Sequence, residues 1–219
     1  MTVRTSKPAV NLREELASLR NQGGYQEQQF WFENAVTNGD FASNTSGWSV
    51  TAPATATWSA GAVNLARNSG SSVQNLFQTF TLEVGRTYKF FINITALSNT
   101  LSLHSTGGGA LIGTASSTGV FSATKVWAAS DTGLYVGCGG STTATATVDD
   151  ILVFETDGTD VIHTMPKGWK PKDVFEDGLL QREGAAHDYT IVYDGFDYYV
   201  KPAVAPSATT QTCVIGVKA

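Results

Sequence analysis

Residues 87–95 read Thr-Tyr-Lys-Phe-Phe-Ile-Asn-Ile-Thr, and this stretch decides the fold class. Tyr88, Phe90, Ile92 and Ile94 occupy every second position, which is the pattern of a β-strand with one buried face. The preceding residues 83–86, Glu-Val-Gly-Arg, are typical of a turn. The sequence therefore predicts a β protein whose core is built on this strand.

Short apolar runs on both sides of this strand, from Trp48 to Phe154, are separated by Gly, Ser and Asn. Leu134, Val136 and Cys138 repeat the alternation. This spacing is expected of an antiparallel β-sandwich. Near the end of the region the apolar positions change parity between Val148 and Ile151, so we expect a β-bulge at Asp149-Asp150.

The N-terminal region predicts a short helix from Asn11 to about Asn21. Residues 11–14, Asn-Leu-Arg-Glu, form a capping-box arrangement, and Gly23-Gly24 ends the helix. A helix of about three turns is marginal alone in water, so its apolar stripe must be buried against its own domain, a sister subunit or a larger assembly. The residues expected to anchor this region are the stripe and three adjacent aromatics: Leu12, Leu16, Leu19, Phe30, Trp31 and Phe32.

The C-terminal region predicts a compact set of β-hairpins. Asp177-Gly178 and Asp194-Gly195 are type I′ turn signals, expected to join residues 173–175 to 179–181 and 189–193 to 196–200. The chain thus divides into an N-terminal arm and helix (1–33), a β-sandwich (34–156) and a β-hairpin module (157–219). The predicted fold is mainly β, a sandwich preceded by a short helix and followed by a hairpin module.

Composition excludes several classes of protein. The net charge of −5 argues against a nucleic-acid partner. Residues 90–124 carry no Asp, Glu, Lys or Arg, but Gly, Ser, Thr and Asn interrupt the run, so no membrane span is predicted. The first residues lack the pattern of a classical secretion signal. Cys138 and Cys213 have no metal or redox spacing and are expected to be buried free thiols.

Three segments of the central region resemble a known family. Residues 36–41 (Val-Thr-Asn-Gly-Asp-Phe) with 46–48, residues 80–88 and residues 148–151 are similar, in that order, to carbohydrate-binding modules of the galactose-binding-like jelly-roll type. The resemblance covers residues 34–156 and implies a jelly-roll sandwich. It also implies a structural Ca²⁺ near the sandwich ends, held by Asp40 and Asp150 with Asn38. The alternative is that Asp40 caps a turn and Asp150 bonds only to bulge amides.

The two ends of the chain resemble virion proteins. Residues 173–181 with 188–190 are similar to a hairpin module of tailed-bacteriophage fibre proteins, with Asp-Gly at the turn where that family usually has Asn-Gly. Residues 7–14 are similar to the first residues of some phage fibre and appendage proteins, where that segment attaches to the particle. Together these resemblances imply a structural protein of a tailed phage, assembled in the host cytoplasm and located in the virion.

The sequence offers candidate glycan contacts but no catalytic constellation. Sugars stack on exposed aromatics, and Trp58 and Trp127 are the candidates, with core packing as the alternative for each. Trp48 is expected in the core. Asp149-Asp150 is a poor catalytic pair, and no histidine lies in a nucleophile motif, so we expect no enzyme activity.

These observations predict an appendage of a phage particle, either a short fibre or a fibre adaptor. Its N-terminal arm would dock on portal, tail, neck or capsid proteins, and its sandwich would be displayed, with host surface glycans as a possible target. A homo-oligomer is expected because such appendages follow particle symmetry. One alternative is a capsid decoration or cement protein, and another is an autonomous carbohydrate-binding module.

Overall fold

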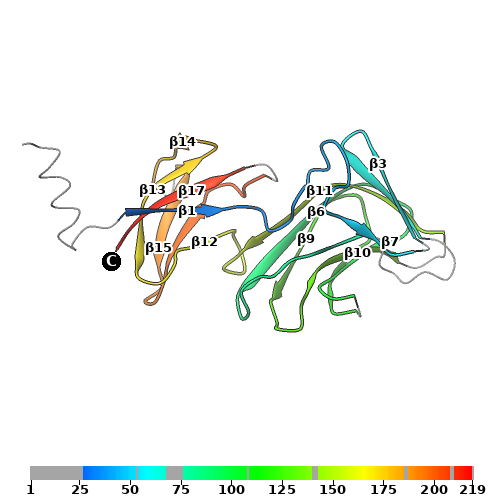
Figure 1. Ribbon diagram of the computed structural model, residues 1–219, viewed down its shortest axis with the longest axis horizontal. Coiled ribbons are helices and arrows are strands. Elements are labelled where there is room, and N and C mark those ends of the chain that lie inside the picture. The colour runs from blue at the N-terminus through cyan, green and yellow to red at the C-terminus, as the bar shows by residue number, and fades with distance from the viewer. Residues whose placement is uncertain are drawn as a thin grey trace, which may run out of the picture.

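The computed structural model describes residues 27–52, 54–67, 76–107, 109–139, 143–184, 187–207 and 210–218. The described part is mainly β-strand and contains no helix, so nothing within it has the length and apolarity to cross a membrane as a helix. It forms two modules placed end to end (Figure 1). The predicted helix, with Leu12, Leu16 and Leu19, lies outside the described residues.

The larger module is a β-sandwich of two five-stranded antiparallel sheets, which confirms the predicted mainly-β sandwich class. One sheet has the order β2(Ser49–Val50)-β5(Leu76–Thr79)-β10(Gly133–Gly139)-β7(Thr100–His104)-β8(Leu111–Ala115). The other has the order β3(Thr55–Ser59)-β4(Ala62–Ala66)-β11(Thr145–Glu155)-β6(Thr87–Leu97)-β9(Gly119–Val126). We call this module the sandwich.

The strand that decides the fold class lies in the middle of the second sheet. Within β6, Tyr88, Phe90, Ile92 and Ile94 are all buried, as the alternation predicts. They pack against buried residues from both sheets, and Trp48 also lies in this core, as expected. The hydrophobic effect of burying so many side chains is the main stabilising contribution to the sandwich.

The predicted bulge is confirmed. The register of β11 against β6 shifts between Val148 and Ile151, so Asp149 and Asp150 are the irregular residues. The loop before β2 docks there, because the amide of Ile151 donates to the carbonyl of Gly39 at 2.8 Å. A Cβ at position 39 would lie 2.2 Å from the Ile151 carbonyl oxygen, so only glycine permits this approach.

The smaller module, which we call the hairpin module, combines strands from both ends of the chain. One sheet has the order β1(Glu27–Phe32)-β17(Thr212–Lys218)-β13(Trp169–Glu176)-β14(Leu179–Leu180). The other has the order β12(His163–Thr164)-β16(Tyr198–Pro202)-β15(Tyr189–Tyr193). Residues 27–32, grouped with the N-terminal arm by sequence, therefore form the edge strand of a C-terminal sheet, and the sandwich is inserted between β1 and β12.

The two Asp-Gly turns differ. Asp177 and Gly178 have φ values of 49° and 81°, which is the predicted type I′ turn between β13 and β14. The prediction of a two-residue turn at Asp194-Gly195 is wrong, because β16 begins at Tyr198 and the loop has four residues. The carboxylate of Asp194 accepts hydrogen bonds from the amides of Phe196 (2.8 Å) and Asp197 (2.9 Å), and this Asx-type turn lengthens the connection.

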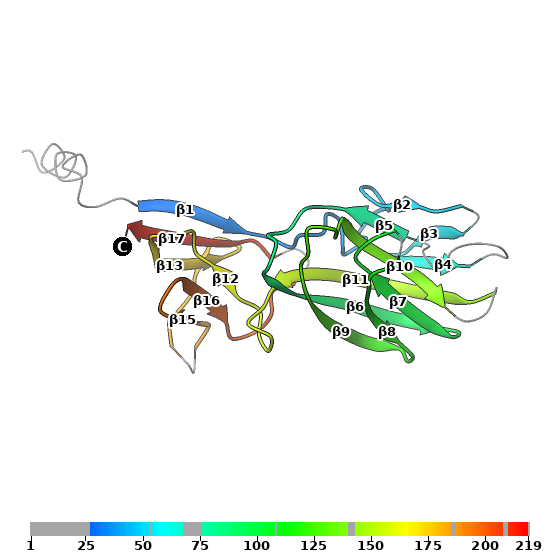
Figure 2. The same cartoon turned by 90° about the horizontal axis from the view of Figure 1, so that it is seen from below.

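Both described ends of the chain lie at the pole of the hairpin module that faces away from the sandwich (Figure 2). Glu27 pairs with Val217 at this pole, whereas the residues that follow β1 and precede β12 run at the opposite, sandwich-facing side. Cys138 and Cys213 are buried free thiols, one in each module, as predicted.

Candidate binding groove between the modules

The junction of the two modules contains two adjacent cavities of about 400 and 460 Å³ that share Arg86 and Glu155 in their walls. Arg86 ends the turn before β6, and Glu155 ends β11, so both come from the sandwich. The opposite wall is the outer face of the sheet β12-β16-β15. There Thr164, Tyr199 and Val192 form one row, because Tyr199 pairs with each of the other two. We call the two cavities together the junction groove.

A charged network fixes the sandwich side of the groove. Arg86 bonds through Nε to Glu83 at 2.7 Å and through Nη1 to Glu155 at 2.8 Å. Thr164 of β12 donates its hydroxyl to the same Glu155 oxygen at 2.7 Å, so this carboxylate joins the modules. Burial alone would lower the pKa of Arg86, but the two carboxylates outweigh it and raise that pKa.

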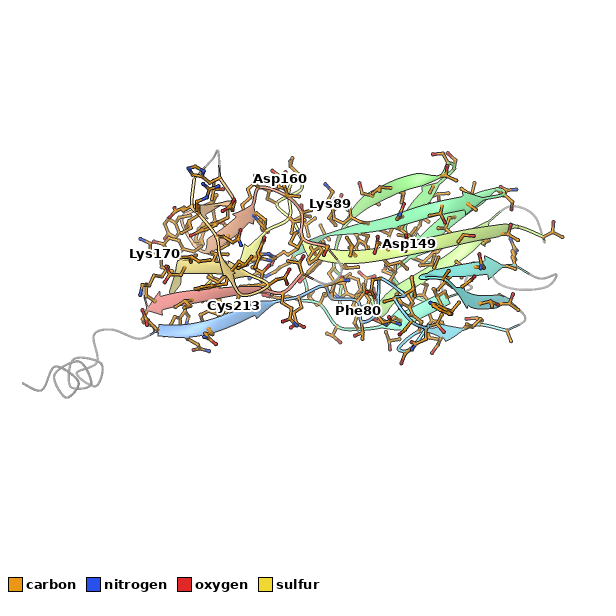
Figure 3. All side chains as sticks on the ribbon, turned by 90° about the horizontal axis from the view of Figure 1, so that it is seen from above. Phe80, Lys89, Asp149, Asp160, Lys170 and Cys213 are labelled. Carbon is orange, nitrogen blue, oxygen red and sulfur yellow. The ribbon has the colours of Figure 1, made fainter. Side chains whose placement is uncertain are left out.

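A second network fixes the turn between β11 and β12. Lys201 of β16 bonds to Asp157 at 3.1 Å and Asp160 at 2.6 Å. The amide of Asp160 is the first cause that lowers the pKa of Asp157, with Lys201 adding to it. Lys89 of the sandwich donates to the carbonyl of Thr159 at 2.9 Å, and Figure 3 shows Lys89 and Asp160 together at the junction.

Tyr199 lines the wall of the cavity of about 400 Å³. Its hydroxyl donates to the carboxylate of Asp194, and this bond is the first cause that raises the pKa of Tyr199 to about 12. The phenol therefore stays protonated and keeps its donor role at neutral pH. Ile162 and Val192 supply the apolar part of the same wall. The groove thus presents a ring, two aliphatic side chains and fixed polar groups, which is the composition of a small-ligand site.

A second hollow of about 490 Å³ lies on the other face of the hairpin module, between β13 and the β15–β16 hairpin. Tyr193 and Tyr198 stack there with ring centroids 4.6 Å apart. Lys170 lies over Tyr198 at 6.0 Å from its centroid, and Lys172 bonds to Glu27 of β1. This hollow offers aromatic and cationic groups, in contrast to the carboxylates of the junction groove.

The predicted calcium residues Asp40 and Asp150 lie near one another, and calcium binding by them stays a prediction. Asp150 is partly buried, and burial, Asp149 and Asp40 together raise its pKa. The carbonyl of Asn38 already accepts from the indole of Trp48 at 3.2 Å, and its side-chain amide donates to the Asn44 and Ser46 carbonyls. Calcium takes six to eight oxygens. Among the described residues no group of three or more His, Cys, Asp or Glu side chains could hold a metal.

The two predicted glycan contacts differ in exposure. Trp127 is only 2% exposed and packs against Phe80 and Tyr88, so the core alternative describes its position. Trp58 is 40% exposed on β3 and donates its indole N–H to the carbonyl of Phe41 at 2.6 Å. One part of its ring is therefore accessible, and a sugar contact there stays a prediction.

The predicted aromatic anchor lies on the hairpin module. Phe30 packs edge-on against Trp169 with centroids 5.1 Å apart, and Phe32 stacks on His163 at 4.9 Å. Trp31 belongs to β1, but its side chain is not among those described. Phe30 and Phe32 thus attach β1 to its own module, and an anchoring role toward another protein stays a prediction.

Sequence reasoning missed the residues of the junction groove. Arg86 and Glu155 are 69 positions apart, and Lys201 reaches Asp157 across 44 positions. No local motif links such residues. The only available signal was the clustering of acidic residues where the sparsely charged sandwich sequence ends, near Glu155 to Asp160.

Comparisons with known proteins give a structural likeness but no match in sequence. No family profile matches the chain, and no curated protein matches it. Among solved structures, the enzymatically active domain of tailspike protein 4 of bacteriophage CBA120 is similar over 56% of this chain, with a TM-score of 0.37 and 14% identity. The match covers 21% of that structure's chain. A likeness of this size carries no argument about function.

The comparison corrects one expectation. We expected no enzyme activity from the absence of catalytic motifs, whereas the solved structure that matches is an enzymatically active domain. Inactivity is therefore withdrawn as a conclusion.

Proposed function

We propose that the protein is a structural component of a tailed phage particle, an appendage that attaches through its N-terminal arm and displays its β-sandwich. The residues that resemble phage fibre and appendage proteins are 7–14 in the N-terminal region and 173–181 with 188–190 in the C-terminal region. The sandwich lies between them in sequence. The particular role is a short fibre or an adaptor that joins fibres to the tail or neck.

This proposal rests on the end-to-end arrangement of the two modules, with the start of β1 at the end opposite the sandwich. Residue 27 enters the hairpin module at the pole opposite the sandwich, where Glu27 pairs with Val217 (Figure 1). An arm that attaches at this pole holds the hairpin module next to the particle and the sandwich farthest from it. The large number of polar side chains on the sandwich surface suits display in water.

A capsid cement protein is the second candidate, and its distinguishing feature is the face in contact. A cement protein would use a broad β surface rather than an arm, and the exposed apolar side chains Val120 and Leu111 of the sandwich are where such a contact would form. An autonomous carbohydrate-binding module would need neither contact.

Particle incorporation tests the proposal. Phage particles assembled without the native protein are mixed with the full chain, with a chain lacking residues 1–24, and with a full-length Leu12→Ser/Leu16→Ser/Leu19→Ser variant. We expect only the full wild-type chain to join particles, while all three chains give the same β-type circular dichroism spectrum. Incorporation of the truncated chain through its β face would overturn the appendage proposal in favour of the cement protein.

A further inference from the structure

In the junction groove the polar groups are fixed before any ligand arrives. Arg86 is held by Glu83 and Glu155, and Lys201 is held by two aspartates. Each ionised carboxylate has about four lone-pair sites and uses only some of them in these contacts. The groove therefore retains acceptors and donors in set positions, and a ligand need not order them.

The charge of the groove walls limits the class of ligand that can bind. The walls of the two cavities contain five carboxylates and three cations: Glu83, Glu155, Asp157, Asp194 and Asp197 against Arg86, Lys167 and Lys201. This excess of negative charge disfavours an anionic ligand, since like charges are desolvated together in a concave site. A ligand that donates hydrogen bonds to carboxylates and accepts them from a guanidinium and an ammonium fits better.

The apolar part of the groove limits the class of ligand further. The ring of Tyr199 lies in the same row as Val192, and Ile162 is 7% exposed beside them. An aromatic ring with flanking hydrogen-bond groups suits a flat molecule that has C–H on its face and hydroxyl groups on its rim. The two cavities share Arg86 in their walls, so a molecule that fills both is longer than one ring.

We propose that the junction groove binds a neutral oligosaccharide, with one sugar on Tyr199 and the next beyond Arg86. Hydroxyl groups of the sugars donate to Asp157, Asp194 and Glu155 and accept from Arg86. This inference deepens the proposed function and rests on it for the source of the ligand, a polysaccharide of the host surface. The groove lies between the pole of attachment and the far end of the sandwich, so attachment at the pole leaves it open.

Binding to a printed array of neutral, amino-bearing and acidic oligosaccharides tests the inference, using the full chain. Val192→Trp fills the groove without touching an ion pair, because Val192 is 42% exposed on the free edge of β15 and tryptophan favours strands. Val120→Trp on β9 is the matched control, since Val120 is 73% exposed and pairs with Asn93, six residues along β6 from Thr87 of the groove.

We expect the wild-type chain and Val120→Trp to bind neutral oligosaccharides equally, and Val192→Trp to bind at least about tenfold more weakly, since the indole occupies the site. Equal binding by Val192→Trp, binding of acidic sugars alone, or no binding to any sugar on the array would each overturn the inference. Val192→Trp should still join phage particles, because the pole is unchanged. A failure of incorporation by wild-type protein would therefore count against the proposed function and not against this site.

Discussion

The sandwich and the hairpin module bury cores of very different size. In the described residues the sandwich core contains twenty-two buried apolar side chains, whereas the core of the hairpin module contains five: Met165, Val174, Tyr189, Val200 and Val214. The hairpin module completes its core with half-buried aromatics, among them Phe30 and Phe32 of β1. A small core needs every strand that it has, so the hairpin module depends on a strand that precedes the sandwich in sequence.

This difference teaches that the two modules do not depend on each other equally. If the sandwich unfolds, β1 is joined to the rest of the hairpin module, which begins at β12, by a loose chain of about 130 residues, and closing such a loop costs about 4 kcal/mol. If the hairpin module unfolds, the sandwich loses only its junction contacts. Unfolding of the sandwich is therefore expected to destabilise the hairpin module, whereas unfolding of the hairpin module should leave the sandwich folded.

The largest expected effect is the replacement of Phe90 by Ala. Phe90 is fully buried, so the change should lower the free energy of unfolding of the sandwich by about 4 kcal/mol. The same variant should lower the stability of the hairpin module, because β1 loses its fixed position. Amide hydrogen exchange followed by mass spectrometry reports on both modules separately.

Met165→Ala is the matched substitution in the core of the hairpin module. Met165 is 1% exposed, and its truncation should cost the hairpin module about 3 kcal/mol while exchange in β6 and β10 stays unchanged. Equal loss of protection in both modules after either substitution would show a single cooperative unit and contradict the asymmetry.

The next largest effect is expected from acid, which should destabilise the hairpin module through His163. His163 is buried against Phe32, and burial lowers its pKa from 6.5 to about 4. The folded state therefore favours the neutral imidazole, and its contribution to stability is complete above pH 6.5 and is lost as the pH falls toward 4. The shift corresponds to about 3 kcal/mol. The hairpin module should lose that stability over this range, as followed by urea unfolding at several pH values.

His163→Leu provides the control for this acid effect. Leucine has a similar volume and cannot be protonated, so the variant should show a flatter dependence of hairpin-module stability on pH between 6.5 and 4. A slope equal to that of the wild-type protein would assign the acid effect to other groups.

The sequence predicted the parts of the fold that depend on local patterns. The alternation of Phe90, Ile92 and Ile94 predicted β6, and the parity change predicted the bulge at Asp149 and Asp150. It did not predict the place of β1, because pairing of Glu27 with Val217 is specified by the surfaces of two distant strands. The junction groove has the same origin: Arg86 and Glu155 meet only once the strands that end in them are paired, and β6 pairs with β11.

A junction substitution should have a moderate effect. Arg86→Met keeps much of the side chain's length and removes both ion pairs, which should cost about 1.5 kcal/mol, because the pair is only partly buried and solvent screens it. The loss should appear first as faster exchange in the sandwich, because Arg86, Glu83 and Glu155 all belong to it. Exchange in the hairpin module should also become faster, because Glu155 accepts the hydrogen bond from Thr164 of β12. Lys89→Met, which removes an exposed bond to Thr159, is the milder comparison and should cost about 0.5 kcal/mol.

The smallest expected effect concerns Asp150 in the bulge. The sign of this effect distinguishes a carboxylate that only destabilises the bulge from one that binds calcium. Burial and the neighbouring aspartates raise the pKa of Asp150, so its ionised form opposes folding. The group is most favourable below its ordinary pKa, and stability is lost as the pH rises through the raised value. Asp150→Asn should therefore stabilise the sandwich at neutral pH in chelator, by about 0.5 kcal/mol, and should have no effect at acidic pH, where the wild-type carboxyl is protonated.

Calcium would reverse that sign. If Asp40 and Asp150 hold a calcium ion, millimolar calcium raises the melting temperature of the wild-type protein and not that of Asp150→Asn, so the variant becomes the less stable of the two. If the melting temperature is the same with calcium and with chelator, the two carboxylates bind no calcium and only lower the stability of the bulge. The sandwich core is large enough to offset that cost, whereas the core of the hairpin module, with five buried apolar side chains, is not.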